Sequence, residues 1–407
     1  MTSERNLQMK CLQLAGHSIQ DIAKRYELNA GHVARTLRET ALGDDHDAAK
    51  LQQLKDQSTY ARARLREGLR NEDLISVATE IAANAIKPFK PVAPPKFAKR
   101  RGAVQETLVL VISDGHHDQV VRAAEVGGLE EYNFPITLRR GQSLVDSTIK
   151  FATQTLSGYQ FRRLVILSLG DSTSGAIHDA ERRSAFGNQF KNDLAIGAFH
   201  GAMVRDLAAH FAQVDVHCVS GNHGRVTVSK EYAGGPHHNH DYAIAKIAEA
   251  ACVGQKNVRF NVPDSWSTTI DVEGYGFNIS HGDDLPGGKP WASLSKRLKG
   301  QSGLHRGADS TKPFCHGAET DYAVVGHYHT LGFTEGNGYS TIHNGAWLAT
   351  DQYAYNKLGV AGVPAQWLFG VHANHGVTWR LPIQLAGNDQ AAKCRYDWIT
   401  ESVQVVQ

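Results

Sequence analysis

Hydrophobic and polar positions along this chain change their pattern between its first hundred residues and the rest. Between about residues 107 and 350, short β-branched apolar runs such as TLVLVIS, RLVILSL and YAVVG alternate with longer amphipathic stretches such as QSLVDSTIKFATQTL. The apolar runs predict buried strands, and the amphipathic stretches between the first of them predict helices. This alternation indicates an α/β domain.

The first forty residues have helical periodicity with a break. Residues 18–37, SIQDIAKRYELNAGHVARTL, have the spacing of a helix-turn-helix, with small Ala23 where two helices must approach and Glu27 in place of the usual turn glycine. Its second helix would present side chains that suit phosphates and base edges, namely Asn29, His32, Arg35 and Thr36. A DNA-binding module and a helical domain for oligomerisation or docking both fit this pattern.

Two further segments separate this module from the α/β region. Strong helix formers from about Asp45 to Ile86 predict a helical spacer that mediates self-association or sets a distance. Four prolines and six Lys or Arg, with no acid before Glu106, then predict an extended, solvated linker. The predicted divisions are a helix-turn-helix module at 1–43, a spacer at 44–86, a basic linker at 87–106, an α/β domain at 107–385 and a tail at 386–407.

Composition limits the cellular compartment that we expect for the protein but does not identify a binding partner. A net charge of +2 gives no global reason to bind nucleic acid or a membrane, and no apolar run reaches the roughly 18 residues of a membrane span. The five cysteines form no CxxC pair and the first residues are too polar for a secretory signal, so we expect a cytoplasmic protein. The 21 histidines do not form a tag, which invites a search for metal ligands.

Five predicted strands end in Asp, Asn or His, usually beside a glycine that allows close approach. In open α/β sheets, sites form at the carboxyl ends of strands. Oxygen and imidazole ligands without thiolate suit divalent ions, and seven candidates exceed one tetrahedral site, so a two-ion centre is predicted. The alternative is a set of solvated polar strand ends. The candidates are Asp114 and His116, then Asp171, then Asn222, then His281, and finally His327 and His329.

The order Asp-x-His, Gly-Asp, Gly-Asn-His, His, Gly-His-x-His resembles that of the calcineurin-like metallophosphoesterase family, with all five blocks in sequence over residues 107–350. The resemblance implies a two-sheet β-sandwich flanked by helices. It also implies that Asp114, His116 and His329 hold one metal ion, and that Asn222, His281 and His327 hold a second, with Asp171 bridging the two. The form GNHGR is similar to that of phosphoesterases encoded by bacteriophages.

The same resemblance implies a phosphoric ester hydrolase in which a metal-bridging hydroxide is the nucleophile. His223 would protonate the leaving oxygen or steady the transition state. Manganese(II) is the expected metal, with iron(II), zinc(II) and magnesium(II) as alternatives.

Two departures from the family pattern affect His223. Ser174 stands where many members have the aspartate that supports this histidine, and a glycine and Arg225 follow Gly-Asn-His where many members have an acid. The partner of His223 is therefore open, with His178 and Asp179 as candidates. Arg225 either meets a substrate phosphate bidentately or is a solvated loop arginine.

Other polar segments have competing interpretations. PHHNHD, residues 236–241, is either another metal site or a polar loop leading into the helix DYAIAKIAEAA, and we favour the loop. His117 is expected to face away from the ligands or to line the rim. The glycine-rich stretch DDLPGGKPW after His281 is a substrate lid or an ordinary loop.

These observations favour a metal-dependent phosphodiesterase or nuclease that acts on DNA, with the N-terminal module bringing it to its substrate. The alternatives are a phosphomonoesterase or a phosphatase of small nucleotides or phosphoproteins, and a catalytically weak DNA-binding protein. The expected partners are DNA or another nucleic acid and a second copy of the chain through the N-terminal helices; no membrane partner is expected.

Overall fold

The structure, a computed structural model, describes residues 6, 9, 13, 18–39, 88–97, 100–175, 184–226, 235–285, 320–335 and 340–404. The chain divides into two compact units, Met1–Val77 and Ala78–Gln407. The predicted spacer at 44–86 and the candidates His178 and Asp179 lie outside the described residues. None of the helices described is long and apolar enough to cross a lipid bilayer.

In the first unit, helices α2 (Ile19–Arg25) and α3 (Ala30–Glu39) are joined by a short turn. Ser18 caps α2 by accepting the Asp21 N–H, and Ile22, Ala23, Val33 and Leu37 form a buried core with Met9. The turn places Glu27 at φ 53°, the left-handed conformation that a glycine would adopt without a steric penalty. Glu27 therefore takes, at this turn, a backbone conformation that is less costly for glycine. Asn29, His32 and Arg35 are exposed.

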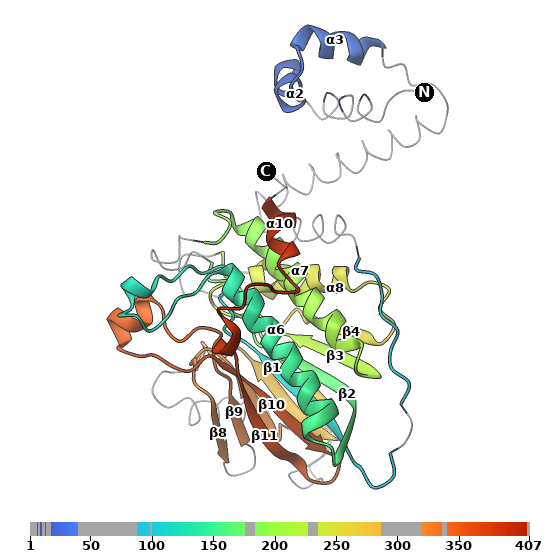
Figure 1. Cartoon of the computed structure of the whole chain (residues 1–407), viewed down its shortest axis with the longest axis vertical. Coiled ribbons are helices and arrows are strands. Elements are labelled where there is room, and N and C mark those ends of the chain that lie inside the picture. The colour runs from blue at the N-terminus through green and yellow to red at the C-terminus, as the bar shows by residue number, and fades with distance from the viewer. Residues whose placement is uncertain are drawn as a thin grey trace. The chain divides into compact units, whose positions relative to one another are not determined.

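Two sheets and their helices make up the second unit (Figure 1). The six-stranded sheet has the order β11-β10-β1-β2-β3-β4, and the five-stranded sheet has the order β5-β6-β7-β9-β8. In the first sheet the strands are β1 (Val104–Ile112), β2 (Tyr159–Ser168), β3 (Gln213–Cys218), β4 (Val258–Asn261), β10 (Ala365–His372) and β11 (Gly376–Gln384). In the second they are β5 (Ser267–Val272), β6 (Tyr275–Ser280), β7 (Tyr322–Val325), β8 (Gly332–Glu335) and β9 (Ser340–His343).

Helices cover the outer face of the six-stranded sheet. They are α6 (Phe134–Lys150), α7 (Gln189–Ala208), α8 (His240–Ala251) and the C-terminal α10 (Trp398–Gln404), with shorter helical turns at Ala123–Glu125, Phe151–Thr155, Pro236–His238, Ala354–Leu358 and Ala386–Asn388. Strands β1 to β4 run parallel, as do β6, β7 and β9. This arrangement confirms the predicted two-sheet sandwich flanked by helices.

Strand β1 shows why the apolar runs in the sequence are not interrupted by polar residues at alternate positions. Leu108 and Leu110 point into the core under the helices, while Val109 and Val111 point into the core between the sheets. Alternate side chains of a strand face opposite sides, so a strand with two buried faces needs an apolar residue at nearly every position. From the second sheet, Phe277, Ile279, Val324 and Ile342 complete the core between the sheets.

The basic, proline-rich segment is extended, as predicted, but residues 88–97 are not simply solvated. The Phe89 N–H donates to the Ala251 carbonyl at 2.8 Å, and Gln255 exchanges two hydrogen bonds with the backbone of Val92, at 2.8 and 2.7 Å. Phe89 and Val92 explain why the segment is not fully solvated, because both side chains pack on the core under the helices.

The predicted tail also packs on the sandwich. Asp389 and Glu130 both bind the guanidinium of Arg140, which is 2% exposed and also donates to the Trp347 carbonyl. A buried arginine with carboxylates on two sides joins the C-terminal segment to α6. The free-energy cost of burying the Arg140 charge is offset only while its carboxylate partners are present.

Replacing Arg140 by Ala should destabilise the second unit by about 3–5 kcal/mol, because Glu130 would be left as a buried charge without its partner. The measurement is the midpoint of denaturant unfolding. Arg122→Ala is the control, since Arg122 is 65% exposed and lies 3.9 Å from Glu125; its loss should change stability by less than about 1 kcal/mol. Equal midpoints for the two variants would contradict the prediction.

Candidate metal centre

The predicted ligands follow the carboxyl ends of β1, β2, β3, β6 and β7, and the structure brings all of these ends together. Backbone hydrogen bonds connect the loops: the Asp114 N–H donates to Gly170, and the His116 N–H donates to Asp171. Across the two sheets, the His327 N–H donates to both carboxylate oxygens of Asp114, at 2.9 and 3.1 Å. Ends of strands from both sheets therefore meet at one edge of the sandwich.

One group of ligand atoms comes from Asp114, His116 and His329, and these atoms all lie within 4.8 Å of one another. The Nε2 atoms of the two histidines are 3.3 Å apart, and Nε2 of His329 is 3.4 Å from Oδ1 of Asp114. These are the three residues that the resemblance assigns to the first ion. The Asp114 carboxylate is fully buried, while the side chain of His329 is 34% exposed, so the group opens to solvent on the His329 side.

A second group contains Asp171, His281 and His327, again within 4.8 Å. Nε2 of His281 lies 2.9 Å from Oδ2 of Asp171 and 3.0 Å from Oδ1 of Asn222, which adds the amide oxygen to the group. Asp171 also forms a third group with His116 and His223. It therefore lies where the other groups join, the position expected of a bridging ligand.

The chemistry of these atoms fits a cation. Nδ1 of His281 donates to the Leu169 carbonyl at 2.8 Å, so Nε2 is the ring atom that faces the oxygens of Asp171 and Asn222. Those oxygens only accept hydrogen bonds, and a neutral Nε2 with its Nδ1 protonated also offers only a lone pair. Three lone-pair donors facing one another need a proton or a metal ion between them, and a carbonyl that accepts from the far ring nitrogen of a histidine is typical of metal ligands.

Burial keeps two of the imidazoles neutral at physiological pH. Burial and the neighbouring His223 lower the pKa of His116 to about 3, and burial together with the charge of His281 lowers the pKa of His327 to about 4. For His281 burial acts in the same direction, but the Asp171 carboxylate outweighs it and raises the pKa to about 10. A cation that binds there must displace this proton.

Backbone strain is concentrated at the same loops. Among the described residues other than glycine, seven have a φ in the left-handed region, which costs energy for L-residues. Two of them are Glu27, in the turn between α2 and α3, and Glu273, in the turn between β5 and β6. The other five are predicted ligands: Asp114 at 51°, His116 at 42°, Asp171 at 53°, His327 at 68° and His329 at 52°. Strain of this kind clusters at functional sites, and here it aims the ligands at one point.

Two glycines allow the loops to approach the ligands, as predicted from their places in the sequence. A Cβ on Gly221 would lie 2.1 Å from Oδ1 of Asp171, and a Cβ on Gly326 would lie 2.5 Å from Oδ2 of Asp114. Both contacts are shorter than any van der Waals separation. The carboxylates therefore occupy space that any other residue at these positions would fill.

Asp241 organises the centre and was not among the predicted site residues. Its fully buried carboxylate accepts three backbone N–H groups, from Asp171 at 2.9 Å, Ser172 at 2.9 Å and Gly221 at 2.8 Å. The segment 236–241 is a polar turn that leads into α8, as favoured, with Asn239 capping the helix. One side chain at the start of α8 thus fixes the loops after β2 and β3.

The imidazole of His223 is hydrogen-bonded to the main chain. Its Nδ1 donates to the backbone carbonyl of Ser174 at 3.0 Å, and its N–H donates to Oδ1 of Asp171 at 2.8 Å. The side chain of Ser174 lies 3.3 Å from Nδ1 of His116, so this serine contacts two functional histidines. Among the described residues, this main-chain acceptor orients the ring of His223.

Asp118, also missed by the sequence, holds that carbonyl in place. Its buried carboxylate accepts the Ser174 N–H at 2.7 Å, the Thr173 hydroxyl at 3.0 Å and the Asn192 amide at 2.9 Å. Burial raises the pKa of Asp118 to about 6, although these donors favour its charged form. The only sequence signal was an acid four residues after Asp114, and nothing in its spacing distinguishes it from a surface residue.

The remaining candidates lie beside the centre. The guanidinium of Arg225 forms an ion pair with the carboxylate of Asp283, two residues after a predicted ligand, so its proposed phosphate contact stays a prediction. His117 turns away from the ligands, as one of the two expectations had it: its Nε2 is 3.0 Å from Nε2 of His200, and its ring packs on Trp347.

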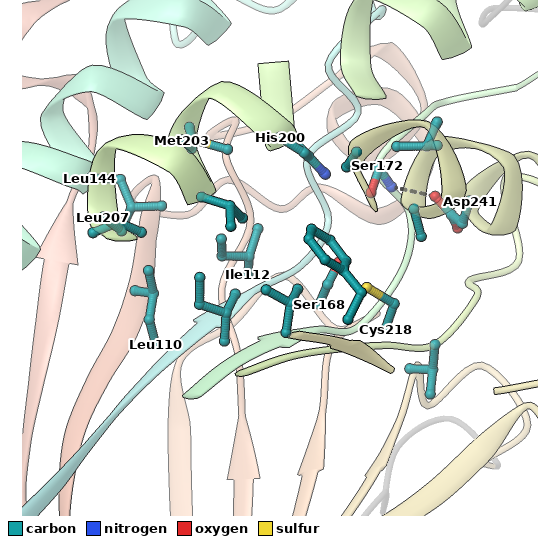
Figure 2. A pocket seen from close by; sticks show the side chains of 18 of the residues that line it. Leu110, Ile112, Leu144, Ser168, Ser172, His200, Met203, Leu207, Cys218 and Asp241 are labelled. Atoms are coloured by element: carbon teal, nitrogen blue, oxygen red, sulfur yellow. Dashed lines mark hydrogen bonds between the residues drawn. The ribbon is translucent and has the colours of Figure 1, made fainter. Parts of the chain in front are cut away.

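A cavity of about 30 Å³ lies in the core under α6, α7 and α8. Apolar side chains such as Leu110, Ile166 and Val216 line most of it, and Figure 2 shows His200, Ser172 and Asp241 among its polar lining residues, the last two joined by a hydrogen bond. This volume holds about two water molecules. It is far too small to hold a phosphoester.

No family model matches this sequence, and no curated protein matches it either. Solved structures that it resembles include Vps29 of Entamoeba histolytica in complex with zinc, at 12% identity and a TM-score of 0.30 over 68% of this chain and all of the other (100%). An archaeal phosphodiesterase is 9% identical, with a TM-score of 0.31 over 68% of this chain and 99% of its own. A conserved uncharacterized protein of Streptococcus pneumoniae, described as a predicted phosphoesterase, is 10% identical, with a TM-score of 0.27 over 69% of this chain and 99% of its own. These identities do not transfer an activity.

Gly221→Ala should lower the affinity of the purified protein for divalent metal at least about tenfold, because the added Cβ displaces the Asp171 carboxylate. Metal content after dialysis, measured by mass spectrometry, checks this. Gly158→Ala is the matched control, since a Cβ at Gly158 meets nothing within 4 Å and its metal content should equal that of the wild type. Full metal content in both variants would show that the loops tolerate the shift.

Proposed function

We propose that this chain is a dinuclear-metal-dependent phosphoesterase related to the calcineurin-like metallophosphoesterases, and that it cleaves phosphodiesters in DNA. The observation that carries the proposal is the pair of ligand groups joined at Asp171, each with the residues expected of it. Their separate origins in five loops, and the strained backbone at five of the ligands, have no other evident purpose.

When bound, two divalent ions supply Lewis acidity that activates a water and neutralises charge on the phosphoryl oxygens. The protein fixes the geometry of this chemistry. The two oxygens of Asp171 are held separately, Oδ1 by the His223 N–H and Oδ2 by the imidazole of His281. The His223 N–H restrains the carboxylate, and Asp171 would hold the ions once the proton on His281 is displaced.

His223 is the candidate general acid. Its Nδ1–H is fixed on the Ser174 carbonyl, so proton exchange with a substrate takes place at Nε2. Its ring packs edge-on against that of His116, with centroids 4.7 Å apart, which restrains its orientation beside the first ligand group. In this proposal, Nε2 of His223 donates its proton to the leaving oxygen of the phosphoester.

The choice of DNA is supported by the rest of the chain. Helix α3 exposes His32 and Arg35, Asn29 is exposed just before it, and six cations in the segment 87–101 attract phosphates. A phosphomonoesterase or a phosphatase of small nucleotides would not need these features. Manganese(II) is the metal we propose, since carboxylate, amide and imidazole ligands without thiolate suit it.

His223→Ala should lower the kcat for a generic diester about 100- to 10,000-fold at saturating manganese, because general acid catalysis contributes that much, while the metal content stays the same. Asp171→Asn should lose both turnover and metal. The measurements are initial rates on a generic diester, a monoester and labelled DNA, together with metal analysis of each variant. Equal residual hydrolysis in all three proteins favours the binding-protein alternative, and turnover of monoesters alone rejects the nuclease.

Removing residues 1–77 should weaken binding to duplex DNA and flatten its salt dependence, with little effect on hydrolysis of a generic diester. The segment 88–97 is retained because it packs on the second unit. In the full chain, Arg35→Ala should reduce the slope of log affinity against log salt by about one for its lost phosphate contact. Salt-dependent anisotropy titrations measure both effects, and an unchanged slope refutes the assignment of the module to DNA.

A further inference from the structure

Residues 349–363 form a compact loop that projects from the second unit. The Gly362 N–H donates to the Ala349 carbonyl at 2.7 Å, and the Thr350 hydroxyl donates to the Val360 carbonyl at 2.8 Å, so the two ends of the loop lie together. Between them, the helical turn Ala354–Leu358 ends at Gly359, which has a φ of 65°. Loops closed in this way are frequently functional.

Exposed aromatic and aliphatic side chains are concentrated on this loop. Eleven large hydrophobic side chains are exposed among the described residues, and five of them lie here, between 37% and 65% exposed: Tyr353, Tyr355, Leu358, Val360 and Val363. Leu129 is another, at 54%. It lies two residues from Gly127, whose lack of a side chain leaves room for the Tyr355 hydroxyl (Figure 1, orange and cyan ribbons at the left edge). A concentration of this kind marks an interaction surface.

Hydrogen bonds tie the loop to the candidate metal centre. Ser174, which contacts His116, donates to Oε1 of Gln119 at 3.3 Å, and Nε2 of Gln119 donates to Oδ2 of Asp351 at 3.3 Å. The other oxygen of Asp351 accepts the Ala354 N–H at 2.7 Å and so holds the first turn of the loop. The surface is therefore fixed relative to the ligands.

The loop also lies on the open side of the centre. A Cβ added to Gly362 would be 3.4 Å from the carbonyl of His329, the predicted ligand whose side chain is one-third exposed. The end of the loop therefore lies beside the backbone of this partly exposed ligand.

We propose that Tyr353 and Tyr355 form a stacking surface for unpaired bases next to the scissile phosphate, so that the substrate is single-stranded nucleic acid. The proposal rests on the phosphoesterase function above and names its substrate more closely. Exposed aromatic rings stack on bases, and residues 352–363 carry one cation, Lys357, and no acid, which suits an adjacent phosphate. Bases in a duplex have no free face, so only an unpaired strand uses this surface.

The test uses the full chain without divalent metal, to prevent cleavage, and measures anisotropy of a labelled oligothymidylate and of an abasic strand of the same length. We expect the wild type to prefer the base-bearing strand about 5- to 150-fold, corresponding to stacking of one base. The double variant Tyr353→Ala, Tyr355→Ala should lose that preference. Tyr353→Phe, Tyr355→Phe should keep it, because the rings remain, and Leu358→Ala should keep it because that side chain is apolar but not aromatic.

Three results overturn the proposal: an undiminished preference in the double alanine variant, a lost preference in the double phenylalanine variant, or no preference in the wild type. If sedimentation shows self-association that only the alanine variant abolishes, with strand binding unchanged, the loop is a contact between copies. Rates on a generic diester with manganese are measured in parallel. Absence of hydrolysis by the wild type refutes the phosphoesterase, whereas the binding comparison reports on the loop alone.

Discussion

A buried carboxylate at Asp171 is the constraint around which this unit is built. An ionised group with 1% of its surface exposed is costly unless opposite charge and hydrogen-bond donors surround it. Although burial raises its pKa, the charges of His281 and His223 hold the pKa of Asp171 well below the ordinary range. The carboxylate is therefore charged, and it draws ligand loops from both sheets around itself. The sandwich supplies the rigid edge on which those loops meet.

The loops are held by a second set of buried acids that do not face the ligands. Asp241 fixes the backbone after β2 and β3, and Asp118 fixes the turn that presents the Ser174 carbonyl to His223. Such residues need no contact with substrate to affect function, because a loop that carries strained ligands returns to ordinary backbone geometry when its anchors are lost. Positioning in this protein is accordingly a property of main-chain hydrogen bonds more than of ligand side chains.

This division explains what the sequence could and could not predict. Strands with two buried faces are legible as apolar runs, and a ligand directly after such a run has a fixed place in space, so the sandwich and the meeting of the seven residues were foreseeable. The carbonyl of Ser174 has no sequence signature, because every residue has one. Asp241 and Asp118 resemble surface acids until their backbone partners are known. The docking of Phe89 and Val92 depends on a surface assembled from distant helices, which a proline-rich composition does not reveal.

Those hidden contacts also relate the ligands to the surface around them. Ser174 lies between His116 and Gln119, and Gln119 donates to Asp351, so one line of hydrogen bonds runs from a predicted ligand to the base of the loop that carries Tyr353 and Tyr355. An aspartate at position 174 would bring a charge toward His116 and Gln119, whereas a serine hydroxyl can accept from one and donate to the other. The serine at this position therefore has a structural role of its own. It is equally the residue required to couple the orientation of a ligand to the placement of the loop beside it.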